Sequence, residues 1–381
     1  MLPFYIGTEE LHRGLHAAVM VGMPDIAELL LGAGADPDVR TPPRDREAEA
    51  AALRVLNPAE QARLDAEYEK YRKANPRMHD EYGEYSDLLV RLNDPDANNA
   101  DLATPLIHLC ESSFCILEPA IMRGEAEYHS SQHRLWLDRA QSIQRRLIEQ
   151  LLAAGADVHA RDTIGRTALL ATACVHPTGV RLMCGDGYYP LGSLEPLPTI
   201  QRLLAAGADV NALDIAGNSI LLLMAGHDSA LVRLLLDAGA TVNCQNRHGY
   251  SPLETAASSA NPETLRMLLA AGADVDVRDE NDFTPLHHVV FCASSKTTSS
   301  MAASVMTVRT LVEAGSDPNA KGAKGRTPLH IAAAEGVVAD LVHALLNAGA
   351  VKHAIDELGT TPYDLAVRMG SAHLIPILRG Y

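Results

Sequence analysis

Apolar side chains recur along the chain in short helical patterns, each closed by a glycine. In the clearest example, Leu265, Leu268 and Leu269 repeat at i, i+3 and i+4, the spacing of one buried helix face. Gly272 follows, and glycine readily takes the left-handed conformation in which many helices end. The pattern predicts an α-helix that opens at Pro262 and ends before Gly272.

A shorter apolar pattern precedes this helix. Ser251 is a good helix cap, and Pro252 is tolerated at the first helical position because its missing N–H would be unpaired there. Leu253, Ala256 and Ala257 then give a face of small residues that a neighbouring helix can approach closely. Together the two patterns predict two consecutive helices.

The phrase that closes the helix pair occurs seven times. Its copies are GADPD at 34–38, GADVH at 155–159, GADVN at 207–211, GATVN at 239–243, GADVD at 272–276, GSDPN at 315–319 and GAVKH at 349–353. The shortest spacings between their glycines are 32, 33 and 34 residues, and the longer ones require insertions. A fixed period of this length predicts stacked repeats, in which neighbours bury faces that one repeat cannot bury alone.

Three further phrases carry a family resemblance: LHAAVMVG at 15–22, TPLHH at 284–288 and TPLHIAAAEG at 327–336. With the glycine phrases they make the chain resemble the ankyrin-repeat family. The resemblance implies an all-α solenoid of about eight helix-turn-helix repeats with short β-turn or hairpin tips. We place the repeats at 8–40, 99–160, 162–213, 214–245, 246–278, 279–321, 322–356 and 357–381.

The predicted organisation has terminal caps and four insertions. It comprises an N-terminal capping repeat (1–40), a charged helical insertion (41–98), repeats over 99–356 with insertions near 111–140, 176–198 and 293–304, and a C-terminal capping repeat (357–381). The second insertion should end in one extended helix. The third reads as a loop or a short hairpin, and the fourth as a loop or a helix extension. For the first, a surface role and packing on the back of the solenoid both stay open.

The charge balance narrows the class of partner. Lys and Arg number 32 against 48 Asp and Glu, a formal net charge of −16. Nucleic acid and anionic membranes require basic patches, so neither is expected. A basic protein partner is compatible with this acidity. Solubility alone would also explain it, and we expect a monomer when no partner is bound.

The cellular compartment follows from what the sequence lacks. Six cysteines include no CxxC pair and read as reduced, mostly buried side chains. We find neither a secretory signal nor an apolar run long enough to span a membrane, which predicts a cytoplasmic protein. Arg outnumbers Lys by 26 to 6, a bias that fits a bacterial source.

Candidate chemistry is sparse. His129 and His133, beside Glu125 and Glu127, could hold zinc on a helix. An exposed polar helix is the favoured interpretation, because no HExxH motif or cysteine completes the set. Nucleophile and phosphate-loop motifs are missing as well. We therefore predict no catalytic residue, no metal site and no cofactor.

The resemblance implies binding through the tips of the turns and the concave face of the first helices. It also implies that the TPLH-position histidines, His16, His287 and His330, form structural hydrogen bonds. His288 is an extra histidine that could lie on the surface. The predicted partner-binding residues are Arg166, Ile215, Asn218, Arg247, His248, Tyr250, Glu280, Asn281, Phe283, Lys324 and Arg326.

Five of these are the preferred anchors, because interface hot spots favour aromatic and arginine side chains: Arg166, Arg247, Tyr250, Phe283 and Arg326. An alternative, in which an insertion of the same chain covers the aromatic rings, stays open. The function that these observations favour is a non-enzymatic protein-binding module, with an immunity or inhibitor protein as the first hypothesis. An effector or adaptor that docks to a host or partner protein is the second, and an enzyme with its site in an insertion is the third.

Overall fold

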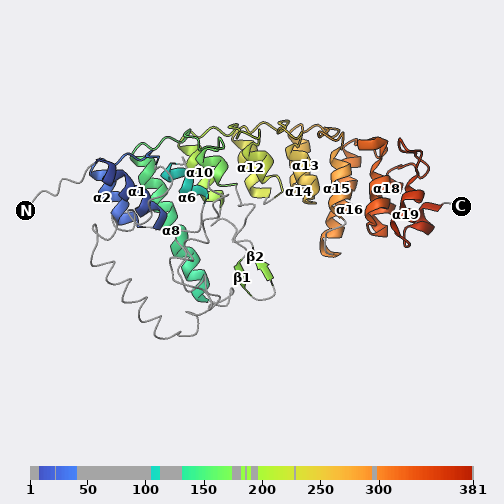
Figure 1. Cartoon of the computed structure of the whole chain (residues 1–381), viewed down its shortest axis with the longest axis horizontal. Coiled ribbons are helices and arrows are strands. Elements are labelled where there is room, and N and C mark those ends of the chain that lie inside the picture. The colour runs from blue at the N-terminus through green and yellow to red at the C-terminus, as the bar shows by residue number, and fades with distance from the viewer. Residues whose placement is uncertain are drawn as a thin grey trace, which may run out of the picture. The chain divides into compact units, whose positions relative to one another are not determined.

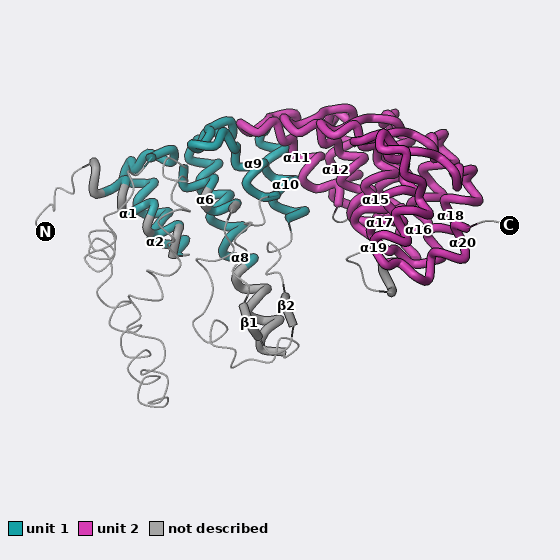
Figure 2. Tube along the Cα trace, turned by 45° about the vertical axis from the view of Figure 1, so that its right-hand side comes forward, with its two compact units in different colours: residues 1–209 teal, residues 210–381 magenta. Residues whose placement is uncertain are grey.

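The fold is seen in a computed structural model that describes residues 8–21, 23–40, 104–111, 131–173, 182–184, 187–189, 196–226, 229–293 and 298–379. The first insertion (41–98) lies outside these residues. The chain forms two compact units, Met1–Asp209 and Val210–Tyr381, called unit 1 and unit 2 (Figure 2). The described residues of each unit form helix pairs.

The part of unit 1 that the structure describes forms three helix pairs and one hairpin. Its elements are α1 (Thr8–Val21), α2 (Pro24–Gly32), α6 (Pro105–Glu111), α8 (Ser131–Ala153), α9 (Ala168–Ala171), β1 (Leu182–Cys184), β2 (Gly187–Tyr189) and α10 (Pro196–Ala205). The first helices of the pairs pack in the order α1, α6, α9, and α2 packs on α8. β1 and β2 pair antiparallel within the third insertion, where a loop or a short hairpin was expected. The long α8 confirms the extended helix predicted at the end of the second insertion.

Unit 2 holds five helix pairs. Its elements are α11 (Ile220–Met224), α12 (Ser229–Asp237), α13 (Pro252–Ser258), α14 (Pro262–Ala270), α15 (Pro285–Ala293), α16 (Thr298–Glu313), a 3-10 turn (Ala323–Gly325), α17 (Pro328–Glu335), α18 (Ala339–Asn347), α19 (Pro362–Met369) and α20 (Ile375–Arg379). The inner helices α11, α13, α15, α17 and α19 pack in a row, and the outer helices α12, α14, α16 and α18 form a second row. The loops between successive pairs gather along one edge of this unit (Figure 1).

The core of unit 2 lies between these two rows. Leu253, Leu286 and Leu329 occupy the same position of three successive inner helices and are at most 1% exposed. Leu268 and Leu345 on the outer helices are fully buried. Burying a leucine stabilises a fold by about 1.5–3 kcal/mol, and here each of these side chains needs a neighbouring repeat to cover it.

The caps and turns form as the sequence predicts. The Ser251 hydroxyl accepts from the Glu254 N–H, and the Glu254 carboxylate accepts from the Ser251 N–H, so α13 begins with a complete capping box. Gly272 has φ +90° and ends α14 in the expected conformation. Asp282 stands where most repeats have a turn glycine, and its φ of +59° confirms that aspartate takes the left-handed conformation there.

Three of the seven glycine phrases end in an asparagine that connects its repeat to the next. The Asn243 side chain donates to the Gly272 carbonyl at 2.9 Å and accepts from the Asp274 N–H at 2.9 Å. Asn211 and Asn319 make the same two bonds to the loops that begin at Gly239 and Gly349. Because one amide satisfies two backbone groups of the neighbouring repeat, it fixes the spacing between repeats.

Truncation of the inner row tests this packing. Leu286→Ala should lower the free energy of unfolding by about 2–5 kcal/mol, because it leaves a cavity that only two adjoining repeats could fill. Leu358→Ala removes a leucine that is 71% exposed and should change it by less than about 0.5 kcal/mol. Urea denaturation followed by circular dichroism gives both values, and equal effects would contradict the assignment of the core.

Candidate functional site

The five-residue loop before an inner helix is called a tip here, and five of the described tips are each held by a side chain at the first position. The backbone N–H of that residue donates to the carbonyl of the fifth residue, and its side-chain oxygen accepts from the N–H groups of the third and fifth residues at 2.8–3.1 Å. This arrangement recurs at Asp162, Asp214, Asn246, Asp279 and Asp356. The recurring Asp or Asn was visible in the sequence and was not among the predicted functional residues.

Neighbouring tips of unit 2 are joined by backbone bonds. The Arg247 N–H donates to the Ala216 carbonyl at 2.9 Å, and the Glu280 N–H donates to the His248 carbonyl at 3.1 Å. Further along, the Arg278 guanidinium donates to the Lys321 carbonyl at 2.8 Å. The tips 214–218, 246–250, 279–283 and 322–326 therefore form one continuous edge.

Most of the predicted partner-binding residues of unit 2 lie exposed on this edge. We call the exposed set the tip row: Ile215, Arg247, His248, Tyr250, Glu280, Asn281 and Lys324. Its side chains are apolar, aromatic and charged, a mixture found at protein interfaces. The role of these residues as contacts stays a prediction.

Two arginines from the predicted partner-binding set form ion pairs with aspartates of the tips. Arg166 belongs to unit 1, is 6% exposed, and its Nε donates to the Asp162 carboxylate at 2.7 Å, so the expected exposure of this anchor was wrong. Arg326 is half-buried, with its Nε 3.5 Å from the Asp356 carboxylate. Burial alone would raise the pKa of Asp356, but the hydrogen bonds from the Thr360 and Leu358 N–H groups and the nearby Arg326 guanidinium outweigh it and lower that pKa. Both arginines neutralise a carboxylate that holds a tip.

Phe283 and Asn218 are half-buried and make contacts between repeats. The Phe283 ring stacks on His287 with centroids 5.1 Å apart and meets His288 edge-on at 6.0 Å. It also covers Gly322 of the next repeat so closely that a Cβ there would lie 2.4 Å from a ring carbon. Phe283 is therefore packed against its own helix and the next repeat, where an exposed anchor was expected. Asn218 donates to Asp214 and accepts from Asn246.

The TPLH-position histidines take the structural role that the resemblance implied. His287 Nδ1 accepts from the Thr284 N–H at 3.1 Å, and its Nε2 lies 3.1 Å from the Arg326 carbonyl of the next repeat. His330 makes the equivalent contacts to Thr327 and to the carbonyl of Thr360. These partners require the tautomer with the proton on Nε2. His16 in unit 1 is buried too.

His288 lies inside the protein and not on its surface. It is 6% exposed, and its Nε2 is 3.1 Å from the Asp279 carboxylate. The local pattern does not indicate this burial, because His288 follows His287 directly and a helix places consecutive residues on different faces. Tyr250 of the tip row covers it, with ring centroids 5.5 Å apart.

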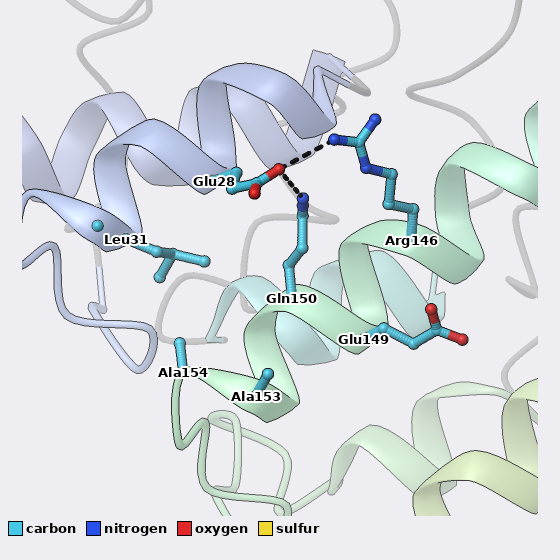
Figure 3. Close-up of a pocket in the computed structure, with 8 residues that line it drawn as sticks. Glu28, Leu31, Arg146, Glu149, Gln150, Ala153 and Ala154 are labelled. Atoms are coloured by element: carbon cyan, nitrogen blue, oxygen red, sulfur yellow. Dashed lines mark hydrogen bonds and ion pairs between the residues drawn. The ribbon is translucent and has the colours of Figure 1, made fainter.

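Unit 1 has an open groove of about 680 Å³ between α2 and α8 (Figure 3). Glu28 bridges Arg146 at 2.9 Å and Gln150 at 3.2 Å across it, and Arg146 also reaches Asp25 at 2.8 Å. Small-molecule sites are usually enclosed and largely apolar. The ion pairs that span this open groove are typical of a solvated contact between two helices.

Among the residues that the structure describes, no cluster of three or more His, Cys, Asp or Glu side chains could hold a metal ion. His129, Glu125 and Glu127 of the zinc hypothesis lie outside them, as does the side chain of His133. No helix in the described ranges is both long and apolar enough to cross a membrane. Burial raises the pKa of the Cys110 thiol to about 12, which makes it unreactive near neutral pH.

Comparison with known proteins decides the family. A family model of ankyrin repeats in three copies matches residues 193–279 and 299–380, and a single-repeat model matches 15–42. Together these segments cover about half of the chain. The chain belongs to the ankyrin-repeat family.

Curated ankyrin proteins are similar over a shorter stretch. The chain is 34% identical over 110 residues to "Ankyrin repeat and SOCS box protein 6" of Homo sapiens, and the protein of the same name from Pongo abelii matches equally. The match covers 27% of this ankyrin-repeat chain and 22% of those relatives. The chain thus spans about a fifth of the length of the relatives that it matches.

The buried ankyrin histidines predict a pH dependence. Burial lowers the pKa of His287 from 6.5 to about 4. The neutral ring therefore contributes stability above pH 6.5 that is lost as the pH falls through 4, by about 3 kcal/mol at most. The free energy of unfolding should fall more steeply between pH 6.5 and 4 in the unaltered protein than in His287→Gln, which has no titratable group there. Parallel slopes in urea titrations would contradict this.

Proposed function

We propose that this ankyrin-repeat chain is a non-enzymatic protein-binding module that recognises a protein partner through the tip row of unit 2. Ankyrin repeats generally mediate protein–protein interaction. The observation that carries the proposal is the edge of tips, in which the buried Asp279 and the half-buried Asp214 and Asn246 hold the backbone. Seven of the predicted contact residues lie exposed on this edge.

Preorganisation favours this edge as a binding surface. Each tip of unit 2 with Asp or Asn at its first position has its third and fifth N–H groups bonded to that side chain. Ordering a loop on binding costs free energy, and a loop already held in place avoids that cost. Phe291, near the C-terminal end of the inner helix α15, is 51% exposed and adds apolar surface to that helix.

The charge of the chain supports a basic partner. The net charge of −16 attracts a positively charged protein and speeds its encounter. It also opposes binding to nucleic acid and anionic membranes, so we expect neither as a partner. An inhibitor or immunity role would fit this acidity, and the cytoplasmic location and the monomeric state stay predictions.

An adaptor role is the second candidate. The observation that favours it is the name of the curated relatives, which joins ankyrin repeats to a second module, the SOCS box. In such a protein the repeats would bind one partner while another part of the chain contacts a second one. A protein captured by the tip row that does not lose its own activity on binding would support an adaptor over an inhibitor.

Paired substitutions test the binding surface. Arg247→Ala with Tyr250→Ala should weaken capture of the cellular partner about 30-fold, the effect of losing one or two interface hot spots. Arg247 is exposed and Tyr250 is 37% exposed, so the free energy of unfolding should fall by no more than about 1.5 kcal/mol, through loss of the Tyr250 ring over His288. Affinity capture from the native cell, quantified by mass spectrometry, gives the loss of binding.

The matched control lies on the outer helices. Arg266→Ala with Met306→Ala removes an exposed arginine and a large apolar side chain that is 41% exposed, and it should leave capture unchanged. If both pairs capture the partner as well as the unaltered protein, the tip row is not the binding surface.

A further inference from the structure

One tip of unit 2 is tied to a histidine instead of an arginine. Asp279 Oδ1 accepts from the N–H groups of Asn281 and Phe283 at 2.8 and 2.9 Å, which closes the tip 279–283. Its second oxygen, Oδ2, lies 3.1 Å from Nε2 of the buried His288. The same carboxylate therefore holds the tip and faces a titratable ring.

In the other tips, the residue that pairs with the first side chain differs from the histidine found beside Asp279. Asp162 pairs with Arg166 and Asp356 with Arg326, and an arginine keeps its charge at every pH that a protein survives. Asp214 accepts from the uncharged amide of Asn218. Among the described tips with a carboxylate at the first position, 279–283 is the one whose closest partner can gain or lose a proton near neutral pH.

A second buried carboxylate reaches the same ring nitrogen. Glu254 is fully buried, and its Oε2 accepts from the Ser251 N–H. Its Oε1 has no hydrogen-bond partner among the described residues and lies 3.9 Å from His288 Nε2. One N–H cannot satisfy both carboxylates, so an ionised Glu254 leaves a buried charge without a partner beside Asp279.

The protonation of Glu254 follows from this environment. Burial raises the pKa of Glu254 to about 7, the bonds from Ser251 limit the rise, and the charge of Asp279 adds to it. Burial lowers the pKa of His288, against the pull of Asp279. A raised carboxylate pKa means that Glu254 contributes most stability below its ordinary pKa of 4.5, and that this contribution is lost as the pH rises through 7.

We propose that Glu254, Asp279 and His288 form a pH-sensitive cluster, which holds the tip 279–283 closed while Glu254 is protonated and loosens it when both carboxylates are charged. The tip carries Glu280 and Asn281 of the tip row, so the cluster regulates the binding surface proposed above and in that respect rests on it. The opening of the tip itself does not depend on any partner.

Other ionisable groups surround the cluster. The tip 246–250 supplies Tyr250 and the exposed His248, which lies 3.4 Å from Glu280. The segment before α15 contributes Arg278 and Glu280, and α15 itself contributes His287 and Cys292. A test must therefore separate Glu254 from these neighbours, and substitution of Glu254 alone does so.

Hydrogen exchange of the free chain measures the opening of the tip. Exchange of the amides of 279–283 is followed by mass spectrometry at pH 6 and pH 8 and corrected for the intrinsic effect of pH on exchange. The opening equilibrium of this tip should rise about tenfold or more at pH 8, because each unit of pKa difference between closed and open forms is worth a factor of ten. The tip 356–360, closed by the same bonds but paired with Arg326, should change less than about twofold.

Two variants assign the effect. Glu254→Gln keeps the shape of the side chain without its charge and should abolish the excess opening at pH 8. Glu254→His introduces the residue that the next two repeats have at this position, His287 and His330. It should also abolish the excess opening at pH 8. This second variant can be measured if Glu254→Gln does not fold. Equal pH dependence of the two tips in the unaltered chain, or excess opening that persists in the folded variants, would overturn the proposal.

These results are independent of the proposed function. Exchange is measured without a partner, so failure of the pH-sensitive cluster leaves binding by the tip row untouched. If the cluster is confirmed while the Arg247 and Tyr250 variants still bind normally, the cluster controls a tip that is not the binding surface.

Discussion

The structure depends on one constraint: a single helix pair cannot bury its own apolar faces. Leu253, Leu286 and Leu329 are buried only because a neighbouring repeat covers each of them. Stability in unit 2 is therefore a sum of contacts between neighbours. Anything that fixes the spacing between repeats also fixes the core.

Polar cross-links supply that spacing. Asn243 joins one loop to the backbone of the next, and the TPLH-position His287 reaches the carbonyl of the following tip. Asn243 is exposed and His287 is buried, and both side chains bond to backbone groups that lie outside the helices. The exposed side chains of the tip row therefore belong to a backbone that is ordered before any partner binds.

Much of this fold could be predicted from the sequence. The period of the glycine phrases gave the repeats, and the cap at Ser251 and the turn at Gly272 gave the ends of the helices. These features are local, since each depends on a few consecutive residues. The extended α8 followed from local pattern as well.

The sequence-based predictions that the structure corrects concern residues whose role depends on a neighbour in space. Arg166 was predicted to be an anchor, but it is paired with Asp162. Phe283 was predicted to be an anchor as well, but its ring packs against Gly322 of the next repeat. His288 is buried for the same kind of reason. A period shows which residues share a position in the repeat, but not which of two nearby side chains turns inward.

The tips of unit 2 should be rigid before any partner binds. Hydrogen exchange of the free chain at one pH near neutrality measures this through the amides of 216, 218, 248 and 250, which bond to Asp214 and Asn246. If the tips are preorganised, these amides exchange as slowly as those of the neighbouring inner helices. Exchange at the rate of an unstructured peptide would show instead that the tips become ordered only on binding.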